Sequence, residues 1–240
     1  MRKFKELKHN IEMTCYEHQQ KTADISILVL VHNSPKLTLK TLWTLKKTEN
    51  VQYETIVLDN ASDLTTKILL KLLFFFGYID KLVYSPENTF FAAGNNIASE
   101  FANEDTKYYL LLNSDIKIIR KDWLKKLKNN HKYGISSIGI CDIGKKNERV
   151  DGYCFLIDKD LYDKYKLDEN FKWFYGITKL TINILKEPDC TVQGYKDKSN
   201  YIKHYWGGSG TDYKKVLNRV SQEEMGSWFE GTKKVIISEL

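Results

Sequence analysis

Asparagine, serine and aspartate follow an apolar segment at Asn113-Ser114-Asp115, and these side chains could bind a metal ion or a nucleotide. The preceding residues 108–112 (YYLLL) are wholly apolar. Taken alone, Asn-Ser-Asp suits a turn or a helix cap. A carboxylate there is also the hard oxygen ligand that Mg²⁺ and Mn²⁺ prefer, and such an ion could neutralise phosphate charge. Asp115 is therefore the first candidate for a site.

Polar residues follow two other apolar segments in the same way. His32 and Asn33 come after residues 25–31 (ISILVLV), and Asp59 comes after residues 53–58 (YETIVL). A carboxylate can accept charge-assisted hydrogen bonds from a base N–H and a ribose hydroxyl. An Asx turn or a helix cap is the alternative role of Asp59.

The apolar segments predict the strands that must position these side chains. Residues 25–31 form a continuous β-branched run, typical of a strand buried on both faces of a parallel sheet. A helix is predicted after Pro35, where leucines and Trp43 recur at near-helical spacing. The other elements of this half are strands at 53–58, 81–84 and 108–112 and helices at 64–76 and 92–101.

Four βα units of this kind predict an α/β fold with a single doubly wound, mostly parallel sheet and helices on both faces. Ligands bind such sheets at the C-terminal strand ends, where the polar residues lie. Strands at 135–140 and 153–157 and helices at 159–165 and 177–185 are predicted to complete the sheet. Residues 1–23 are predicted to be an N-terminal extension. It carries a weak helical pattern at Phe4, Leu7, Ile11 and Met13.

The composition indicates one compact domain. The 240 residues carry a net charge of +6 and are 42% hydrophobic, which is enough for one sizeable core. The scattered lysines favour contact with anionic ligands or an acidic membrane face, whereas nucleic-acid binding would need a clustered patch or a known module. Four cysteines without CxxC spacing indicate reduced thiols and a cytoplasmic location. No secretory signal or transmembrane segment is predicted, and peripheral contact with the inner face of the membrane is left open.

The order of four motifs resembles family 2 glycosyltransferases with the GT-A fold. The motifs are ISILVLVHNSP, ETIVLDNAS, PENTFFAAGNN and YYLLLNSD, and Trp123-Leu124 follows them. The pattern is most similar to bacterial rhamnosyltransferase-like and galactosyltransferase-like members and covers about residues 24–215. Each motif alone is weak, but their order and spacing are specific.

The resemblance implies a donor site on these motifs. The residues that would bind the nucleotide are His32, Asn33, Asp59, Asn88, Asn95, Asn113 and Ser114. Thr89 replaces a glycine that the family usually has, so the loop there is expected to differ. The small residues Ala92 and Ala93 are expected to serve helix packing.

The resemblance also implies a divalent metal, Mn²⁺ or Mg²⁺. Asp115 would coordinate an ion that bridges the diphosphate, and His204, which precedes Trp206-Gly207-Gly208-Ser209, would complete the metal shell. A histidine ligand favours Mn²⁺. An ordinary loop histidine is the alternative role of His204.

The same resemblance divides the chain into halves. Residues 24–135 would be the nucleotide-sugar-binding half, residues 136–215 the acceptor and catalytic half, and residues 216–240 a C-terminal tail, all within one compact domain. A helix in the tail that docks on its own domain is the expected arrangement.

The chain departs from the family where the general base should lie. Asp168-Glu169-Asn170-Phe171 matches the family. Family members have an acidic motif a few residues later, and this chain has Gly176-Ile177-Thr178-Lys179 in its place. A base contributes roughly 10²–10⁴-fold to such reactions. The candidates to replace it are Asp151, Asp168 and Glu169, with Glu187 and Asp189 as further carboxylates. Lys179 could instead contact donor phosphates or be an exposed helix lysine.

The sequence thus predicts a metal-dependent glycosyltransferase that moves a sugar from a nucleoside diphosphate sugar to a glycan or lipid-linked acceptor, with an inverting course, as in polysaccharide biosynthesis. One alternative is a degenerate donor-binding or scaffold subunit without the usual base. A retaining mechanism is another. A nucleotidyltransferase is disfavoured because no Gly-rich, Lys-containing loop follows the first strand. The oligomeric state is left open.

Overall fold

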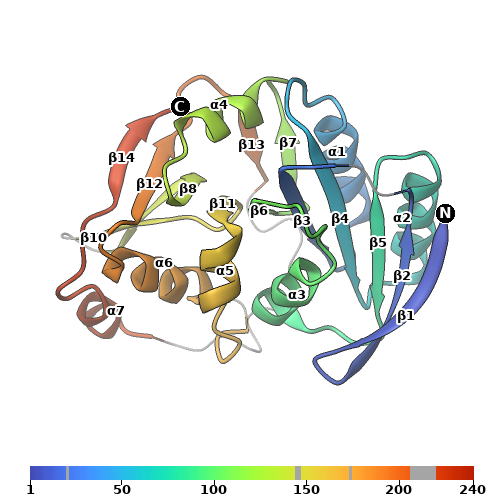
Figure 1. Ribbon diagram of the computed structural model, residues 1–240, viewed down its shortest axis with the longest axis horizontal. Coiled ribbons are helices and arrows are strands. Elements are labelled where there is room, and N and C mark those ends of the chain that lie inside the picture. The colour runs from blue at the N-terminus through green and yellow to red at the C-terminus, as the bar shows by residue number, and fades with distance from the viewer. Residues whose placement is uncertain (20–21, 144–146, 173–174, 206–219) are drawn as a thin grey trace.

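A ten-stranded sheet runs through the molecule in the computed structural model, which describes residues 1–19, 22–143, 147–172, 175–205 and 220–240 (Figure 1). In order across the sheet the strands are β1 (Arg2–Lys8), β2 (Ile11–Glu17), β5 (Lys81–Ser85), β4 (Tyr53–Asn60), β3 (Ile25–Val31), β6 (Tyr108–Leu112), β11 (Cys154–Asp158), β8 (Gly134–Ile138), β12 (Thr191–Lys196) and β14 (Ile236–Glu239).

The parallel centre of the sheet is the one predicted from the apolar runs. Strands β5, β4, β3 and β6 are all parallel, with Leu28 of β3 opposite Leu111 of β6. From β3 the chain moves outward to β4 and β5, and β6 then joins the other side of β3. This reversal creates a topological switch point between β3 and β6, which is where doubly wound sheets bind ligands.

The second half extends the same sheet. β11 is antiparallel to both β6 and β8, and β12 is parallel to β8 and β14. The strands and helices predicted for residues 135–185 are confirmed with shifts of one or two residues at their ends. The mostly parallel α/β sheet is therefore correct.

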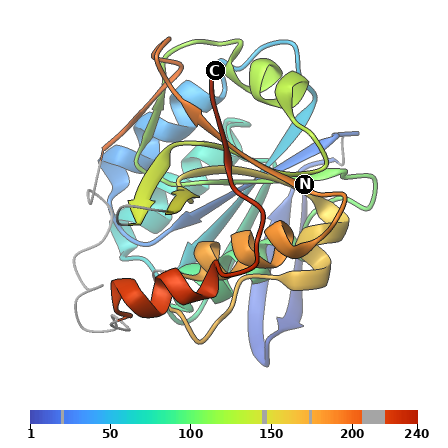
Figure 2. The same cartoon turned by 90° about the vertical axis from the view of Figure 1, so that its left-hand side faces the viewer.

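Helices cover both faces of the sheet, as Figure 2 shows in the side view. On one face lie α1 (Pro35–Leu45), α2 (Leu64–Phe75) and α4 (Trp123–Asn130), which bury Leu42, Leu70 and Trp123 against the strands. On the other face lie α3 (Phe90–Ser99), α5 (Lys159–Tyr165), α6 (Gly176–Lys186) and α7 (Gln222–Trp228). Two apolar cores result, one on each face, as expected for a sheet with buried strands.

The helical pattern predicted near the N-terminus is wrong. Residues 2–17 form the β1–β2 hairpin, whose turn at His9 and Asn10 has positive φ angles, and β2 pairs antiparallel with β5. Met13 and Cys15 are fully buried in the core. Alternation with period two in residues 11–15 buries one face of β2 and leaves the other half exposed. The hairpin continues the main sheet at its edge.

Two small two-stranded sheets lie outside the large one. β7 (Ile116–Ile118) pairs with β13 (Ile202–His204), and β9 (Ile140–Ile143) pairs with β10 (Asn147–Val150). The first brings two distant parts of the chain together beside the end of β6.

The C-terminal residues return to the domain. Phe229, just after α7, is buried in the core under α6, and β14 pairs with β12 at the edge of the sheet. The strand β14 was not predicted. Residues 206–219, which include the motif Trp206–Ser209 and the start of the predicted C-terminal tail, lie outside the described residues.

Candidate functional site

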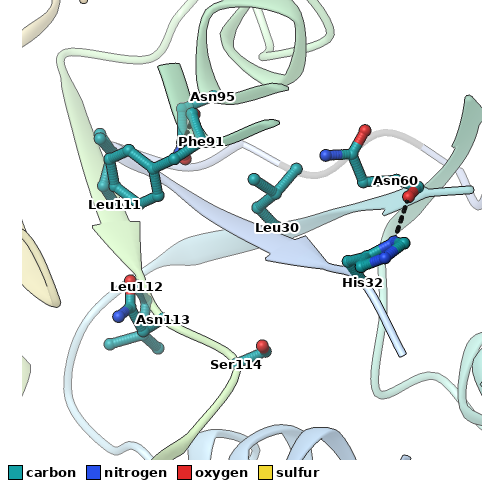
Figure 3. Close-up of a pocket in the computed structure, with 9 residues that line it drawn as sticks. All are labelled: Leu30, His32, Asn60, Phe91, Asn95, Leu111, Leu112, Asn113 and Ser114. Atoms are coloured by element: carbon teal, nitrogen blue, oxygen red, sulfur yellow. Dashed lines mark hydrogen bonds between the residues drawn. The ribbon is translucent and has the colours of Figure 1, made fainter. Parts of the chain in front are cut away.

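A pocket opens at the switch point, where residues of β3, β4, α3 and β6 converge (Figure 3). It is lined by Leu30, His32, Asn60, Phe91, Asn95, Leu111, Leu112, Asn113 and Ser114. Four of these residues, His32, Asn95, Asn113 and Ser114, were predicted to bind the nucleotide. Apolar walls with a few polar groups at one end suit a flat base and its ribose.

His32 is oriented by the strand beside it. Its Nδ1 donates to the backbone oxygen of Asn60 at 2.7 Å, because a carbonyl can only accept. The Asn33 amide nitrogen lies 3.4 Å from its Nε2. The imidazole ring is thus oriented at the pocket wall by contacts at both of its nitrogens.

The loop after β5 is held by the side chain of Asn60. Its Nδ2 donates to Asn88 Oδ1 at 2.8 Å, and its Oδ1 accepts from the Thr89 backbone N–H at 2.8 Å and from the Thr89 hydroxyl at 2.9 Å. Asn88 Oδ1 also accepts from the Phe90 N–H. Asn88 therefore shapes the loop and lies behind the pocket wall.

The backbone strain near Thr89 lies at the next residue, Phe90. Thr89 has a φ of −83°, whereas Phe90, the first residue of α3, has a φ of +62°. Positive φ at an aromatic residue is strained. Gly94 further along α3 allows close packing, because a Cβ there would lie 2.6 Å from Leu30.

Asn33 connects two loops and is not among the pocket residues. Its Oδ1 accepts from the Asp63 N–H at 2.8 Å, and its own N–H donates to the Ser62 hydroxyl. Its φ of +58° places it in the left-handed region that asparagine tolerates. Asn33 thus joins the end of β3 to the start of α2.

Asp59 is fully buried at the end of β4. Its Oδ1 accepts from the Ser62 N–H at 3.1 Å, while Oδ2 has no hydrogen-bond partner among the residues that the structure describes. Burial raises the pKa of this carboxyl, and the hydrogen bonds from Ser62 offset part of the effect. The Ser62 contact is the Asx turn that the sequence offered as an alternative, and Asp59 is not among the pocket residues.

Two neighbouring asparagines of α3 differ in role. Asn95 lines the pocket and donates to the Phe91 backbone oxygen within the helix. Asn96 is buried, donates to the Leu167 oxygen at 2.9 Å and to Glu169 at 2.8 Å, and accepts from the Tyr162 hydroxyl. Asn96 therefore ties the donor half to the segment that carries Asp168 and Glu169.

Asp115 and His204 lie together beside the pocket. The pairing of β7 with β13 places them so, and His204 Nε2 lies 3.1 Å from Asp115 Oδ1. Both side chains are nearly buried, and the Tyr205 N–H donates to the Asp115 backbone oxygen at 2.9 Å. Tyr153 stacks on the His204 ring with centroids 4.4 Å apart. His204 lies in β13 and is held by these contacts, and its role as a metal ligand stays a prediction.

The pair offers a carboxylate oxygen and an imidazole nitrogen to one point. Within the described ranges, no group of three or more His, Cys, Asp or Glu side chains converges as a metal site. Two protein donors fit a divalent ion that takes its remaining ligands from phosphate oxygens and water. The site thus suits an ion bound together with a diphosphate.

Among the predicted replacements for the base, Asp151 lies two residues before Tyr153, whose ring stacks on His204. It is half-buried and follows β10. Its Oδ1 accepts from the Gly152 N–H and its Oδ2 from the Cys141 thiol at 3.1 Å. A carboxylate has about four lone-pair positions, so these contacts leave room for an acceptor hydroxyl.

Asp168 and Glu169 have local structural partners. Asp168 Oδ1 accepts from the backbone and side-chain nitrogens of Asn170 and so closes its own turn. Glu169 accepts from Asn96, and the ring of His9 in the β1–β2 hairpin lies 3.5 Å from it. Glu187 and Asp189 lie beyond the C-terminal end of α6. These contacts favour positional roles for Asp168 and Glu169.

The helix that would carry the family's base is adapted to other contacts. Ile177 is buried, and its Cγ1 would lie 2.7 Å from a Cβ added to Gly152. Lys179 Nζ lies 3.4 Å from the ring centroid of Trp228 in α7, with Phe171 next to it. Lys179 thus makes a cation–π contact with α7 and is not an isolated exposed lysine.

Sequence reasoning missed the apolar pocket wall. Leu30, Phe91, Leu111 and Leu112 belong to strands and a helix that pattern analysis places correctly, but alternation alone does not show which face borders a cavity. Asn60 was noted only as the neighbour of Asp59. Its position after β4 at the switch point was the available signal.

The comparison with protein families identifies the chain. A model described as glycosyl transferase family 2 matches residues 26–214. The chain belongs to glycosyl transferase family 2. The match spans both the pocket and the Asp115–His204 pair, so the family's sequence pattern extends across the whole site. No curated protein matches the sequence.

The GT-A fold of the chain is shared with solved structures. TarS 1-349 of S. aureus aligns with a TM-score of 0.53 and 16% identity over 66% of this chain and 54% of that one. The same stretch of TarS in complex with UDP-GlcNAc aligns over 86% of this chain and 70% of that one, with a TM-score of 0.53 and 16% identity. The mannosyltransferase PcManGT from Pyrobaculum calidifontis, in complex with GDP-Man and Mn²⁺, gives a TM-score of 0.57 and 14% identity over 68% and 53%. The chain thus spans little more than half the length of two of these structures.

Proposed function

We propose that this protein is a metal-dependent glycosyltransferase that moves a sugar from a nucleoside diphosphate sugar to a hydroxyl of a glycan or lipid-linked acceptor. The observation that carries the proposal is the Asp115–His204 pair, 3.1 Å apart and beside the switch-point pocket. Two distant segments meet to form it, as a site for a bound ion and phosphates requires. Membership of family 2 supports the same reaction class.

The donor would bind with its nucleoside in the pocket and its diphosphate towards Asp115. His32 would offer a ring nitrogen, Asn113 and Ser114 polar groups at the pocket end, and Asp59 an acceptor for a base N–H after a side-chain adjustment. When bound to Asp115 and His204, a divalent ion would neutralise the diphosphate and stabilise the leaving nucleotide. The UDP-GlcNAc and GDP-Man complexes of the similar structures support a UDP or GDP sugar as donor.

The acceptor hydroxyl would lose its proton to Asp151. The new glycosidic bond forms as the hydroxyl oxygen attacks the anomeric carbon, the bond from that carbon to the diphosphate breaks, and the proton passes to the Asp151 carboxylate. Asp151 is favoured because Asp168 and Glu169 are held by Asn170 and Asn96. With Asp151 as the base, the configuration at the anomeric carbon would be inverted. Similarity to rhamnosyltransferase-like and galactosyltransferase-like members stays a prediction.

Substitution Asp115→Asn tests the proposal. Donor binding is measured as a thermal shift with UDP, GDP and dTDP sugars, with and without Mn²⁺, because binding to the folded state raises stability. We expect wild type to show a Mn²⁺-dependent shift and the variant to lose turnover by about 100-fold or more, as for other electrostatic stabilisers of a transition state. The control is Asp122→Asn, an exposed carboxylate paired with Arg120. A wild type that neither binds nor turns over any of these donors contradicts the proposal.

Substitution Asp151→Asn tests the role of the general base independently of donor binding. We expect kcat to fall by about 10²–10⁴-fold while donor affinity stays unchanged. Glu169→Ala is the comparison, and its effect is expected on stability, through the lost hydrogen bond from Asn96. Unchanged kcat in Asp151→Asn would exclude Asp151 as the base.

A donor-binding subunit without activity is the second candidate. Burial of Ile177 and the contact of Lys179 with Trp228 favour it, because both positions are adapted to packing. Mn²⁺-dependent donor binding without transfer or hydrolysis of any donor would support this candidate over the first.

A further inference from the structure

Large exposed apolar side chains are concentrated on two adjacent helices. Among the described residues, twelve large apolar side chains are exposed, and seven of them belong to α1, α2 or the residue after α2. These seven, which we call the α1/α2 apolar face, are Leu39, Trp43, Leu64, Ile68, Leu72, Phe75 and Phe76. Isolated exposed leucines are ordinary on a protein surface, but a contiguous group marks an interaction site.

Helix α2 is apolar on both sides. Its inner face buries Leu70, Leu73 and Phe74 against the sheet. Its outer face repeats leucine and isoleucine at Leu64, Ile68 and Leu72, one turn apart, and these are 73%, 52% and 51% exposed. Phe75 and Phe76 follow at 72% and 68%. The fold explains the inner face and leaves the outer face in solvent.

Helix α1 continues the same surface. It lies beside α2 on one face of the sheet (Figure 1). Trp43 stacks on Tyr78, just after α2, with centroids 5.5 Å apart, and Lys46 Nζ donates to the Gly77 oxygen at 2.5 Å. Trp43, itself half exposed, therefore joins the phenylalanines at the end of α2 in one patch.

The charged side chains within these two helical segments are all positive. Residues 35–48 and 64–79 contain no aspartate or glutamate and carry six lysines: Lys36, Lys40, Lys46, Lys47, Lys67 and Lys71. Lys47 lies over the Trp43 ring, and Lys71 is exposed between Ile68 and Leu72 in sequence. The protein's net charge is only +6, so this absence of acids is a local feature.

We propose that the α1/α2 apolar face docks on the surface of an anionic phospholipid bilayer. Apolar side chains on the outside of a helix, flanked by lysines, are the composition of helices that lie in a membrane interface, where lysines are attracted to anionic headgroups. A second copy on the same face would bring lysines against lysines, and the helices α1 and α2 contain no acid to offset them. The side chains of this apolar stripe, Leu64, Ile68 and Leu72, point away from the sheet, which is the orientation that insertion between lipid headgroups requires.

The position of the face connects it with the site. Asp63, the N-cap of α2, is bonded through its N–H to Asn33, next to the pocket residue His32. The apolar stripe thus begins close to the pocket and runs away from it along α2. Docking itself requires no sugar donor, but its benefit for a lipid-linked acceptor rests on the proposed function.

Co-sedimentation with vesicles tests the proposal directly. The full chain is mixed with vesicles of phosphatidylcholine alone or of phosphatidylcholine with phosphatidylglycerol. We expect at least about tenfold stronger partitioning onto the anionic vesicles, and loss of that preference at high salt, because exposed charges are screened. Equal, weak partitioning onto both vesicle types would overturn the proposal.

Paired variants assign the binding to this face. Leu72→Glu/Phe75→Glu and Lys47→Glu/Lys71→Glu are each expected to lower partitioning about tenfold or more, with melting temperature and donor binding retained because these side chains are exposed. The control is Ile236→Glu, 44% exposed on β14 at the opposite edge of the sheet. Vesicle binding unaffected by both pairs, or a dimer that Leu72→Glu/Phe75→Glu dissociates without any vesicle binding, would contradict the assignment.

Discussion

Asp59 shows at the scale of one residue how a binding role can oppose stability. The carboxyl is fully buried, and burial raises its pKa. Its protonated form is therefore favoured in the folded protein, so the stability it contributes is complete below the unfolded pKa and is lost as pH rises through the folded pKa. At neutral pH the ionised Asp59 side chain therefore lowers the free energy of unfolding, as is usual for carboxylates at functional sites.

Asp59→Asn is expected to be more stable than wild type at neutral pH and to bind the donor more weakly. The gain in melting temperature should shrink as pH falls through the titration range of carboxyl groups, because wild type is then neutral as well. Loss of a charge-assisted hydrogen bond lowers donor affinity by about tenfold or more. Melting curves across pH and donor titrations measure the two effects.

Asp63→Ala is the matched control for the sign of this pH dependence. Hydrogen bonding to Thr66 lowers the pKa of the exposed Asp63, which caps α2. Its stabilisation is present above the unfolded pKa and is lost as pH falls, so removal should destabilise at neutral pH and have no effect in acid. An Asp59→Asn variant that follows the same direction as Asp63→Ala would contradict the role of burial.

At the scale of the element, the donor site depends on a loop fixed by one side chain. Asn60 at the end of β4 makes two hydrogen bonds to Thr89 and one to Asn88, and its backbone oxygen orients His32. The strained φ of Phe90 persists because these contacts hold the residues before it. β4, α3 and β3 are thereby joined at the pocket.

Asn60→Ala is expected to loosen this loop. Removal of a partly buried side chain that leaves donors and acceptors unsatisfied should lower the free energy of unfolding by about 1–3 kcal/mol. Donor affinity should fall as well, because the Asn60 side chain holds Asn88 and Thr89 in the loop that leads into α3 at the pocket. Urea unfolding and donor titration measure this, with Asn129→Ala on the exposed surface of α4 as control. An Asn60 variant as stable as Asn129→Ala would show that the loop is held by other contacts.

The elements near the site were predictable to different degrees. Strands β3, β4 and β6 are continuous apolar runs, so their ends, and with them His32, Asp59 and Asp115, follow from the sequence. The contact of His204 with Asp115 follows only from the resemblance, because it depends on the pairing of β7 with β13 between distant segments. The roles of Asn60 and Asn96 depend on long-range hydrogen bonds, which no local pattern records.

At the scale of the whole molecule, membership of family 2 and the mostly parallel sheet agree with the predicted architecture. The two ends of the sheet do not follow from sequence. Residues 2–17 alternate polar and apolar side chains weakly, and their strand conformation depends on pairing with β5. β14 likewise is a short edge strand whose partner, β12, lies about forty residues earlier. Tertiary pairing overrides weak local preference at both edges.

No helix in the described part of the chain is long and apolar enough to cross a membrane.

The β1–β2 hairpin is therefore expected to unfold together with the domain. Met13 is fully buried among core residues, so Met13→Ala should lower the free energy of unfolding by about 2–5 kcal/mol. Leu7→Ala in the same hairpin should change it by at most about 0.5 kcal/mol, because Leu7 is 66% exposed. Urea unfolding followed by circular dichroism measures both variants, with a single transition and an unchanged slope expected. Equal effects of the two substitutions, or a separate early transition, would show that the hairpin packs independently. A large loss confined to Met13→Ala instead makes the hairpin part of the same cooperative core that positions the pocket.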